Sequence, residues 1–414
     1  MRGFHCAFSS SGTKHRISVA TKTIRPSIDF WSYQKVEGPA PMAHYDVIVL
    51  GGGTMGIACA WELAKRGKRA IVLEQFDFVH DRGAHSGRTR IFRHAYAEGA
   101  EYIPLVMRAD QLWQDLETDT DRKVLRRVGC LELAAPGHHH ARRARDSARQ
   151  YNIDFQWLTP ADVRRNWPTI YVPDDWEAGF GSAAGLLDIE EALHGMADCA
   201  RNGGVDLIPN TPVKSWGASS HGVWVTTRDR RYDGNALIVT AGAWTCHVLQ
   251  QLNRSLSIQR KVQFWFKVND PVLYTPDRFP IFITDSEYGE IYGFPIYLAP
   301  GIKVANHTGG DLTDPDHVNR RVADEEKDDI VRFTSWFFEG ITPEVLQTTV
   351  CLYARTPDGD FILDRHPQWT NVILGAGFSG HGFKFAPAIG EHLVSLALES
   401  RQQPASLFRL DRFS

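Results

Sequence analysis

Three features that the chain lacks exclude whole classes of protein. No run of about 18 consecutive apolar residues occurs, so a membrane-spanning helix is not expected. Neither sign of charge is in excess, because the formal net charge is only −3, and a nucleic-acid partner is not expected either. The six cysteines contain no CxxC pair, which argues against a zinc site and a disulfide scaffold and fits a reducing compartment, the cytoplasm in the first place.

The first 44 residues are kept out of the fold prediction because their composition differs from that of the remaining chain. They carry five basic residues before the first acidic residue, Asp29, and many serines and threonines. A compact apolar segment of the kind found in secretory signals is missing. We interpret residues 1–44 as a disordered leader or the product of an upstream start, since Met42 stands just before the first strong strand. A mitochondrial transit peptide is the less favoured alternative.

A βαβ unit opens the folded part of the chain. Residues 45–50 form a short apolar run that is typical of a strand buried on both faces. Residues 51–56 are rich in glycine and break it, and residues 57–66 repeat apolar side chains at helical spacing up to the stop at Gly67. Residues 69–74 form the next strand. This order predicts a parallel pair of strands joined by a right-handed crossover.

The rest of the chain is strand-rich in the middle and ends on another strand, glycine turn and helix. We therefore predict an α/β protein in which a Rossmann-like dinucleotide-binding domain is interleaved with a mixed, mainly antiparallel β-sheet substrate domain. The first domain is predicted to be discontinuous, with residues 45–127, 180–255 and 345–414, and the second to comprise residues 128–179 and 256–344. Further helices are expected over 102–117, 141–151, 190–201 and 387–399, and further strands over 128–134, 222–227, 236–240 and 371–374.

The glycine turn has the spacing of a dinucleotide-binding motif. Gly51, Gly53 and Gly56, with Thr54 and Met55 between them, satisfy G-x-G-x-x-G, which lets backbone N–H groups approach a pyrophosphate. Glu74 ends the second strand, 74 − 51 = 23 residues beyond the first glycine, where an acid can accept hydrogen bonds from a ribose. The acid favours FAD or NAD over NADP. A purely structural glycine turn is the alternative, and the motif by itself does not separate FAD from NAD.

Four sequence blocks elsewhere in the chain favour FAD over NAD. Residues 87–96, 240–244, 351–353 and 377–385 resemble the monomeric sarcosine oxidase and N-methyltryptophan oxidase family, and the resemblance extends from Tyr45 to the C-terminus. It implies that the first domain binds FAD. It also implies oxidation of a small secondary amino acid, N-methyl or cyclic, by hydride transfer to flavin N5, with reoxidation by O2 to give H2O2. A monomer is expected.

The resemblance also assigns roles to single residues. Cys351 matches the cysteine that carries the flavin covalently, and a reactive thiolate requires nearby positive charge. Arg93 and Lys384 match the two ligands of the substrate carboxylate. Lys303 matches the oxygen-activating lysine. Further residues expected to line the catalytic site are His307, Arg90, Tyr292 and Tyr353, and further flavin contacts are expected from Arg82, Ser86, Thr89, Val213, Ala241, Gly242, Trp244, Gly377, Gly380, His381, Gly382 and Lys384.

Ordinary structural roles are the alternative for each of these residues. Cys351 could be an inert buried thiol, the two cations could be ion-paired, and the tyrosines could belong to the core. The chain also departs from the family: Ser86 and Arg88 replace a histidine and an acid, and residues 262–290 differ, so substrate identity is not carried over.

Two competing functions remain open from the sequence alone. One is a dehydrogenase that passes electrons to a quinone or an electron-transfer protein. The other is an NAD-binding reductase or a non-catalytic nucleotide-binding protein. A metal site is not expected: the run His138, His139 and His140 is interpreted as a solvated helix start, because consecutive helical residues point in different directions.

Overall fold

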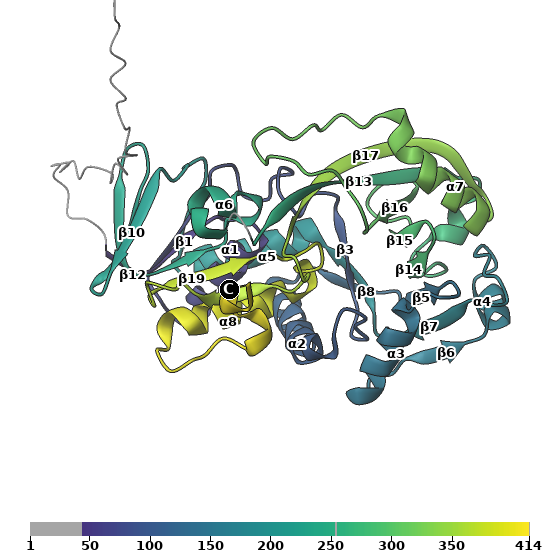
Figure 1. Cartoon of the computed structure of the whole chain (residues 1–414), viewed down its shortest axis with the longest axis horizontal. Helices are drawn as coiled ribbons and strands as arrows, with labels where there is room; N and C mark the ends of the chain where they lie inside the picture. The colour runs from purple at the N-terminus through teal and green to yellow at the C-terminus, as the bar shows by residue number, and fades with distance from the viewer. Residues whose placement is uncertain (1–43, 253–254, 414) are drawn as a thin grey trace, which may run out of the picture. The chain divides into compact units, whose positions relative to one another are not determined.

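The structure is a computed structural model that describes residues 44–252 and 255–413. The expected leader, residues 1–44, therefore lies almost wholly outside the described residues. The described part contains three β-sheets besides its helices, and each sheet joins strands from distant parts of the sequence (Figure 1). Within residues 44–252 and 255–413, every helix is too short or too polar to cross a membrane.

The first sheet has eight strands and a parallel centre. β1 (His44–Leu50) pairs in parallel with β2 (Ala70–Leu73) on one side and with β12 (Arg231–Val239) on the other. β2 also pairs in parallel with β9 (Asp206–Ile208), and β12 with β19 (Val372–Ala376). Antiparallel strands complete the sheet, namely β10 (Ser215–Ser219), β11 (Gly222–Thr226) and β18 (Ile362–Arg365).

Alternation along β1 explains why this sheet is covered on both faces. Val47 and Val49 pack against helices on one face, whereas Ile48 and Leu50 join a separate apolar cluster on the other. A strand that is apolar at every position is typical of a parallel sheet buried on both sides. The covering helices lie together beside β1 and β19 in Figure 1 and are α1 (Thr54–Lys65), α2 (Ile103–Thr120), α5 (Ile189–Asn202) and α8 (Ala386–Leu398).

The second sheet also has eight strands but is mainly antiparallel. Its order is β17–β13–β16–β15–β14–β5–β7–β6, and only β14 and β5 run parallel. One face forms an apolar core in which Phe264, Ile291 and Ile302 meet Phe333. The strands are β5 (Cys130–Ala134), β6 (Gln156–Leu158), β7 (Glu177–Gly181), β13 (Ser257–Val268), β14 (Ile281–Ser286), β15 (Gly289–Phe294), β16 (Ile302–Asn306) and β17 (Ile341–Arg355).

A small antiparallel sheet lies between the two large ones (Figure 1). Its middle strand is β8 (Gly185–Asp188), flanked by β3 (Thr89–Phe92) and β4 (Leu125–Arg127). The remaining helices are α3 (His140–Gln150), α4 (Pro160–Asn166), α6 (Thr245–Val248) and α7 (Asp328–Phe337).

The predicted fold class is confirmed, and so is the βαβ unit, because β1 and β2 pair in parallel across α1. The helix begins at Thr54, three residues before the expected start at Ile57, because Gly53 serves as its N-cap and Gly56 lies inside its first turn. The boundary expected at residue 345 falls inside β17, so Cys351 belongs to the second sheet. The division into two domains stays a prediction.

The interpretation of the histidine run as a solvated helix start is wrong for His140. This side chain is 1% exposed, because strands of the second sheet surround it with carboxylates. His140 Nε2 lies 2.9 Å from Glu132 of β5, and Nδ1 lies 3.6 Å from Glu290 of β15. His138 Nδ1 is instead held by Asp285 at 2.9 Å and is partly exposed.

Candidate active site

The N-terminus of α1 has the features of a phosphate cradle. Its N-cap, Gly53, provides no side-chain cap, and the first turn contains no acidic residue. A Cβ placed on Gly53 would meet nothing within 4 Å, whereas one on Gly56 would lie 1.9 Å from the Gly51 carbonyl oxygen. Gly56 is therefore required for packing, and Gly53 leaves open space in front of uncapped N–H groups. An anion would complete this arrangement.

Glu74 closes the turn from the end of β2. Its carboxylate accepts hydrogen bonds from the N–H of Gly52 (2.7 Å) and of Phe76 (2.9 Å). Burial raises the pKa of Glu74, although these backbone donors oppose the rise. The residue is 4% exposed and lies beside the glycine motif, as the sequence predicts for a ribose-binding acid.

His85 offers an unused polar atom near the same helix end. Its Nδ1 lies 3.4 Å from Thr54 Oγ1 in the first turn of α1, while its buried Nε2 has no hydrogen-bond partner among the described residues. Burial lowers the pKa of His85 to about 3, so the ring is neutral. A buried polar nitrogen without a partner is costly and fits a bound polar group. The open Gly53 side, the uncapped helix and this orphan nitrogen together fit a dinucleotide.

The second face of the second sheet is polar and carries most of the predicted catalytic residues. Strand pairing aligns Lys261 with Cys351, Trp265 with Lys303, and Phe294 with Lys303. Because side chains alternate across a strand, the residues between the apolar core positions all point to this opposite face. It carries Lys261, Gln263 and Trp265 of β13, Glu290 and Tyr292 of β15, Lys303 of β16, His307 just beyond it, and Cys351 and Tyr353 of β17.

Cys351 is fully buried on that face. Its sulfur accepts a hydrogen bond from Gln263 Nε2 at 3.2 Å, while Gln263 Oε1 is buried and finds no partner within the described part of the chain. Ser86 Oγ donates to the carbonyl of Val350, the residue before Cys351, at 3.1 Å. The loop before β3 therefore reaches the cysteine, as the expected flavin contact of Ser86 requires.

Lys303 is buried next to the same loop. Its Nζ donates to the carbonyl oxygens of Gly87 (2.7 Å) and Thr89 (3.0 Å) and to Thr89 Oγ1 (3.2 Å). Burial lowers the pKa of Lys303 well below its ordinary value, and neighbouring Arg90 lowers it further. Arg90 is fixed in turn by the carbonyls of Thr89 (2.7 Å) and Ser86 (2.8 Å). The predicted residues Arg90, Thr89, Ser86 and Lys303 thus lie together.

Arg93 and Lys384 converge on one aromatic ring, that of Tyr96. The Arg93 guanidinium carbon lies 4.7 Å from the ring centre and Lys384 Nζ lies 5.0 Å from it. Lys384 Nζ also donates to the Tyr96 hydroxyl (3.3 Å) and to the His381 carbonyl (3.0 Å). Both cations are buried, at 2% and 6% exposure. Two basic side chains from segments nearly 300 residues apart in sequence are thus brought to one ring, an arrangement that can hold an anion.

Arg93 is not free in this structure. One nitrogen donates to both carboxylate oxygens of Glu98, at 2.8 and 2.6 Å, and the other lies 3.4 Å from Glu132. Burial alone would lower the pKa of Arg93, but these two carboxylates raise it. The Glu98 side chain is 28% exposed, so it is the partner that a ligand carboxylate can replace.

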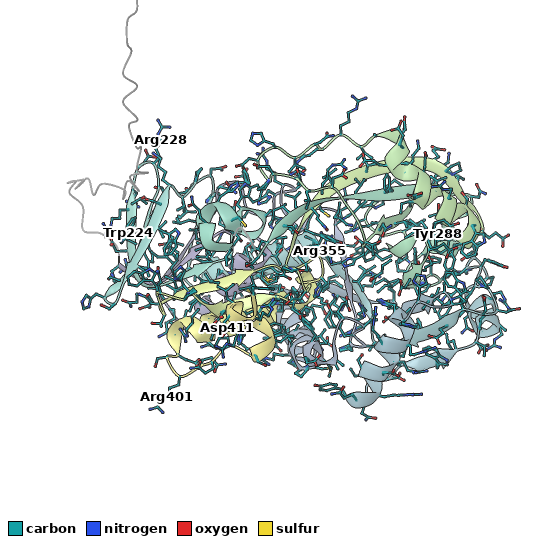
Figure 2. The ribbon with its side chains drawn as sticks, viewed as in Figure 1. Trp224, Arg228, Tyr288, Arg355, Arg401 and Asp411 are labelled. Carbon is teal, nitrogen blue, oxygen red and sulfur yellow. The ribbon has the colours of Figure 1, made fainter. Side chains whose placement is uncertain are left out.

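Aromatic and imidazole side chains also lie on the polar face of the second sheet. Tyr353 lies with its ring centre 5.4 Å from that of His307, and burial raises the pKa of Tyr292 to about 12. Burial also lowers the pKa of His307 to about 3, so its ring is neutral. Arg355 ends β17 in the region between the two large sheets, where Figure 2 labels it.

A tight turn between β19 and α8 contacts both Tyr353 on the polar face of the second sheet and Tyr96 beside the two cations. Gly380 adopts φ +86°, and a Cβ there would lie 2.2 Å from the Tyr353 ring. The next residue, His381, joins the Tyr96 hydroxyl through Nδ1 at 2.7 Å. Gly377 and Gly382 flank this turn, and Lys384 follows in a short 3₁₀ helix (Phe383–Phe385).

The remaining predicted flavin contacts lie around the dinucleotide cradle. Ala241 and Gly242 come directly after Thr240, the residue that follows β12, and the Thr240 hydroxyl donates to the Gly51 carbonyl at 2.9 Å. Val213 lies two residues beyond Thr211, whose N–H donates to the Glu74 carbonyl at 2.7 Å. The carbonyl of Arg82 accepts from Arg320, which also donates to Val350 beside Cys351.

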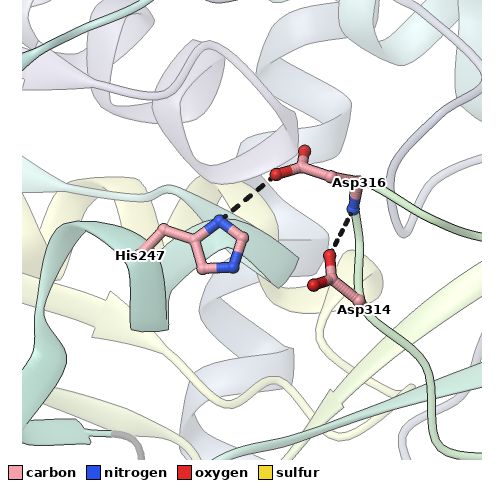
Figure 3. Close-up of side chains that lie close together, drawn as sticks. All are labelled: His247, Asp314 and Asp316. Carbon is pink, nitrogen blue, oxygen red and sulfur yellow. Dashed lines mark hydrogen bonds and ion pairs between the residues drawn. The ribbon is translucent and has the colours of Figure 1, made fainter.

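Trp244 is tied to an exposed cluster on the surface. Its indole N–H donates to Asp316 at 2.6 Å, and Asp316 N–H donates to Asp314 at 2.8 Å. His247 Nδ1 lies 3.6 Å from Asp316, so these three residues form the one possible metal-ligand group among the described residues (Figure 3). All three are exposed, and their contacts tie Trp244 and α6 to the loop after β16.

Comparison with known proteins identifies the family. Residues 46–396 match the FAD dependent oxidoreductase family. The chain is 34% identical over 374 residues to a monomeric sarcosine oxidase of Arthrobacter sp. (strain TE1826), covering 89% of this chain and 96% of that one. It is 32% identical over 375 residues to an N-methyl-L-tryptophan oxidase of Salmonella agona, covering 89% and 99%.

The chain belongs to the FAD-dependent oxidoreductase family. The resemblance inferred from the sequence motifs is thereby confirmed, and the cofactor is FAD. Two solved structures share the fold: NikD, an amino acid oxidase, with a TM-score of 0.77 and 23% identity over 88% of this chain and 97% of that one, and L-proline dehydrogenase from P. horikoshii, with a TM-score of 0.77 and 20% identity over 89% and 98%.

Several residues of this flavoprotein site were not predicted. Tyr96 and Glu98 stand three and five residues after Arg93, and Tyr96 ends one of the four family-like blocks without an expected role of its own. Lys261 and Gln263 alternate with apolar residues along β13, which from sequence alone is typical of a solvent-facing edge rather than a buried site. Lys261 Nζ donates to the Thr308 carbonyl at 2.7 Å, and burial lowers its pKa to about 8.

Proposed function

We propose that this flavoprotein is an oxidase of small secondary amino acids, with FAD attached covalently through Cys351 and O2 as the electron acceptor. The observation that carries the proposal is the pair of buried cations, Arg93 and Lys384, gathered at the Tyr96 ring. Such a pair suits a carboxylate, and it lies beside the polar sheet face that carries Cys351. The names of the relatives, sarcosine oxidase and N-methyl-L-tryptophan oxidase, support the same substrate class.

The side chains would divide the work between binding the substrate and enclosing it. The guanidinium of Arg93 and the ammonium of Lys384 bind the carboxylate, displacing Glu98 from one edge of Arg93. Tyr292, Tyr353 and neutral His307 enclose the rest of the substrate and exclude water. Burial favours the neutral form of the substrate amine, which has a lone pair to donate.

Bound FAD would supply the hydride acceptor, at N5, and on reoxidation the route to hydrogen peroxide. Lys303 is proposed to provide positive charge where oxygen is reduced, since a buried cation stabilises developing negative charge. Burial lowers its pKa, but its hydrogen bonds to three oxygen acceptors favour the ammonium form. The product imine would leave and hydrolyse in water. A monomer and a cytoplasmic location remain predictions, the first supported by the names of relatives called monomeric.

The experiment that tests the proposal is a peroxide assay with a panel of secondary amino acids, run with oxygen uptake on the same samples. Equal molar yields of peroxide and oxygen consumed support an oxidase. Electron transfer to an artificial acceptor without peroxide would instead favour the dehydrogenase alternative. A colourless protein after reconstitution with FAD would refute both.

A further inference from the structure

Glu290 is a carboxylate on the reactive face of the second sheet. It lies on β15 two residues before Tyr292, so both side chains point to the same face. The backbone carbonyl of Glu290 accepts a hydrogen bond from the N–H of His307 at 2.7 Å. Glu290 is thereby held next to His307, another residue of the proposed site. The side chain is 23% exposed and lies within electrostatic reach of Arg93 and Glu98. A carboxyl group therefore stands on the same face of the sheet as the predicted site residues. Burial raises its pKa, and His140 and Arg93 oppose the rise.

The contacts of Glu290 leave its carboxylate under-used. His140 is its one ionic neighbour among the described residues, at 3.6 Å, which is beyond hydrogen-bond distance. That histidine already engages Glu132 through Nε2 at 2.9 Å, and Glu132 contacts Arg93 at 3.4 Å. The Glu290 side chain is three-quarters buried and accepts no hydrogen bond from the described part of the chain. Its oxygens are not sealed from solvent, so the donor of a ligand can reach them.

The charge balance around this group favours a cation. Three carboxylates, Glu98, Glu132 and Glu290, face the guanidinium of Arg93 and the imidazole of His140, and Glu290 and Glu132 raise the pKa of that imidazole against the opposing effect of burial. Lys384 compensates only partly, because burial lowers its pKa to about 7. A substrate carboxylate bound by Arg93 and Lys384 would add further negative charge near Glu290, which favours a cationic group elsewhere on the substrate.

We propose that Glu290 recognises the side chain of the substrate and that the preferred substrate is a secondary amino acid whose side chain ends in a cationic group. This inference rests on the proposed function, because it takes the carboxylate end to be held by Arg93 and Lys384. The carboxylate of Glu290 accepts charge-assisted hydrogen bonds from the substrate ammonium or guanidinium. His140 is a positioning residue that holds Glu290 between Glu132 and the substrate.

The test compares two compounds that differ only in the terminal ammonium, Nα-methyl-L-lysine and Nα-methyl-L-norleucine. For each, the dissociation constant is measured anaerobically from the perturbation or bleaching of the flavin absorbance of the holoenzyme. We expect at least ~10-fold tighter binding of the lysine compound, the effect of a charge-assisted hydrogen bond in a partly buried site. Glu290→Gln is expected to bring the ratio close to one. Glu287→Gln, the same change at an exposed position in the adjacent turn, should keep it.

The ratio separates the two levels of inference. The role of Glu290 is overturned if both compounds bind equally, or if the preference for the lysine compound survives in Glu290→Gln. The proposed function is tested separately, and reduction of the flavin by either compound supports it. If sarcosine and both compounds leave the flavin oxidised, the proposed function fails, and the binding ratio still decides about Glu290. Should Glu290→Gln be insoluble, Glu290→Asp, which retracts the carboxylate by one methylene, must lower the preference several-fold.

Discussion

Replacing Arg93 by lysine tests the carboxylate clamp without unbalancing the buried charges. Removal of the cation would leave buried Glu132 with His140 as its remaining ionic partner, at a cost of up to ~3–5 kcal/mol in stability. Lysine keeps the positive charge but loses the planar fork with which arginine can hold a carboxylate by two hydrogen bonds. The variant therefore removes about one charge-assisted hydrogen bond, worth ~1.5–3 kcal/mol.

At about 1.4 kcal/mol for each factor of ten, that loss corresponds to a KM that is ~10- to 150-fold higher. The catalytic rate at saturation should change much less, because the carboxylate lies away from the reacting carbon–nitrogen bond. Steady-state peroxide assays give both constants, and the visible spectrum reports whether the flavin is retained. Arg108→Lys is the matched control, since two nitrogens of Arg108 hold the Glu391 carboxylate on the surface, at 2.9 and 2.6 Å.

An unchanged KM in Arg93→Lys, with the flavin in place, would refute the clamp. A fall in kcat with constant KM would also contradict it, because that pattern belongs to a group that acts only in the transition state. A KM effect of similar size in Arg108→Lys would show that the assay reports general damage to the fold.

Three further predictions concern the flavin and the second cation. Cys351→Ala should bind FAD yet release it on acid precipitation, and flavin that stays with the precipitated variant contradicts the covalent link. Gly53→Ala should leave the thermal midpoint of the apoprotein within about 2 °C of the wild-type value, because the new Cβ meets no protein atom. The same Cβ would occupy the proposed phosphate space and should weaken FAD binding at least ~10-fold. Gly56→Ala, the control, should destabilise the apoprotein itself, because its Cβ would meet the Gly51 carbonyl oxygen. Burial lowers the pKa of Lys384 to about 7, so the side chain is cationic below that pH and neutral above it. The ratio of kcat/KM in the wild type to kcat/KM in Lys384→Met should therefore fall as pH rises through 7. A ratio that is constant with pH would show that the charge on Lys384 does not matter.

The parts of the fold that depend on short stretches of sequence could be predicted. The strand, glycine turn, helix and strand at residues 45–74 are local in sequence, and their pairing follows from the handedness of the crossover. The start of α1 was missed by three residues because a glycine-rich turn is typical of a break, although Gly53 caps the helix and Gly56 packs inside it.

The polar face of the second sheet could not be predicted, because its burial depends on segments far away in the chain. Along β13, Lys261 and Gln263 alternate with Val262 and Phe264, a pattern that ordinarily indicates one solvent-facing side. Here the loop before β3 covers Gln263 and residues 308–310 cover Lys261, so both residues are buried. His140 was misinterpreted for the same reason, since its two carboxylate partners come from separate strands.

The most direct test of the account is anaerobic addition of a secondary amino acid to the purified yellow protein, followed by readmission of air. We predict that the visible flavin absorbance is lost on addition and returns with air, with one molecule of hydrogen peroxide formed for each flavin. Flavin absorbance that stays unchanged with every secondary amino acid in the panel would contradict the proposed function.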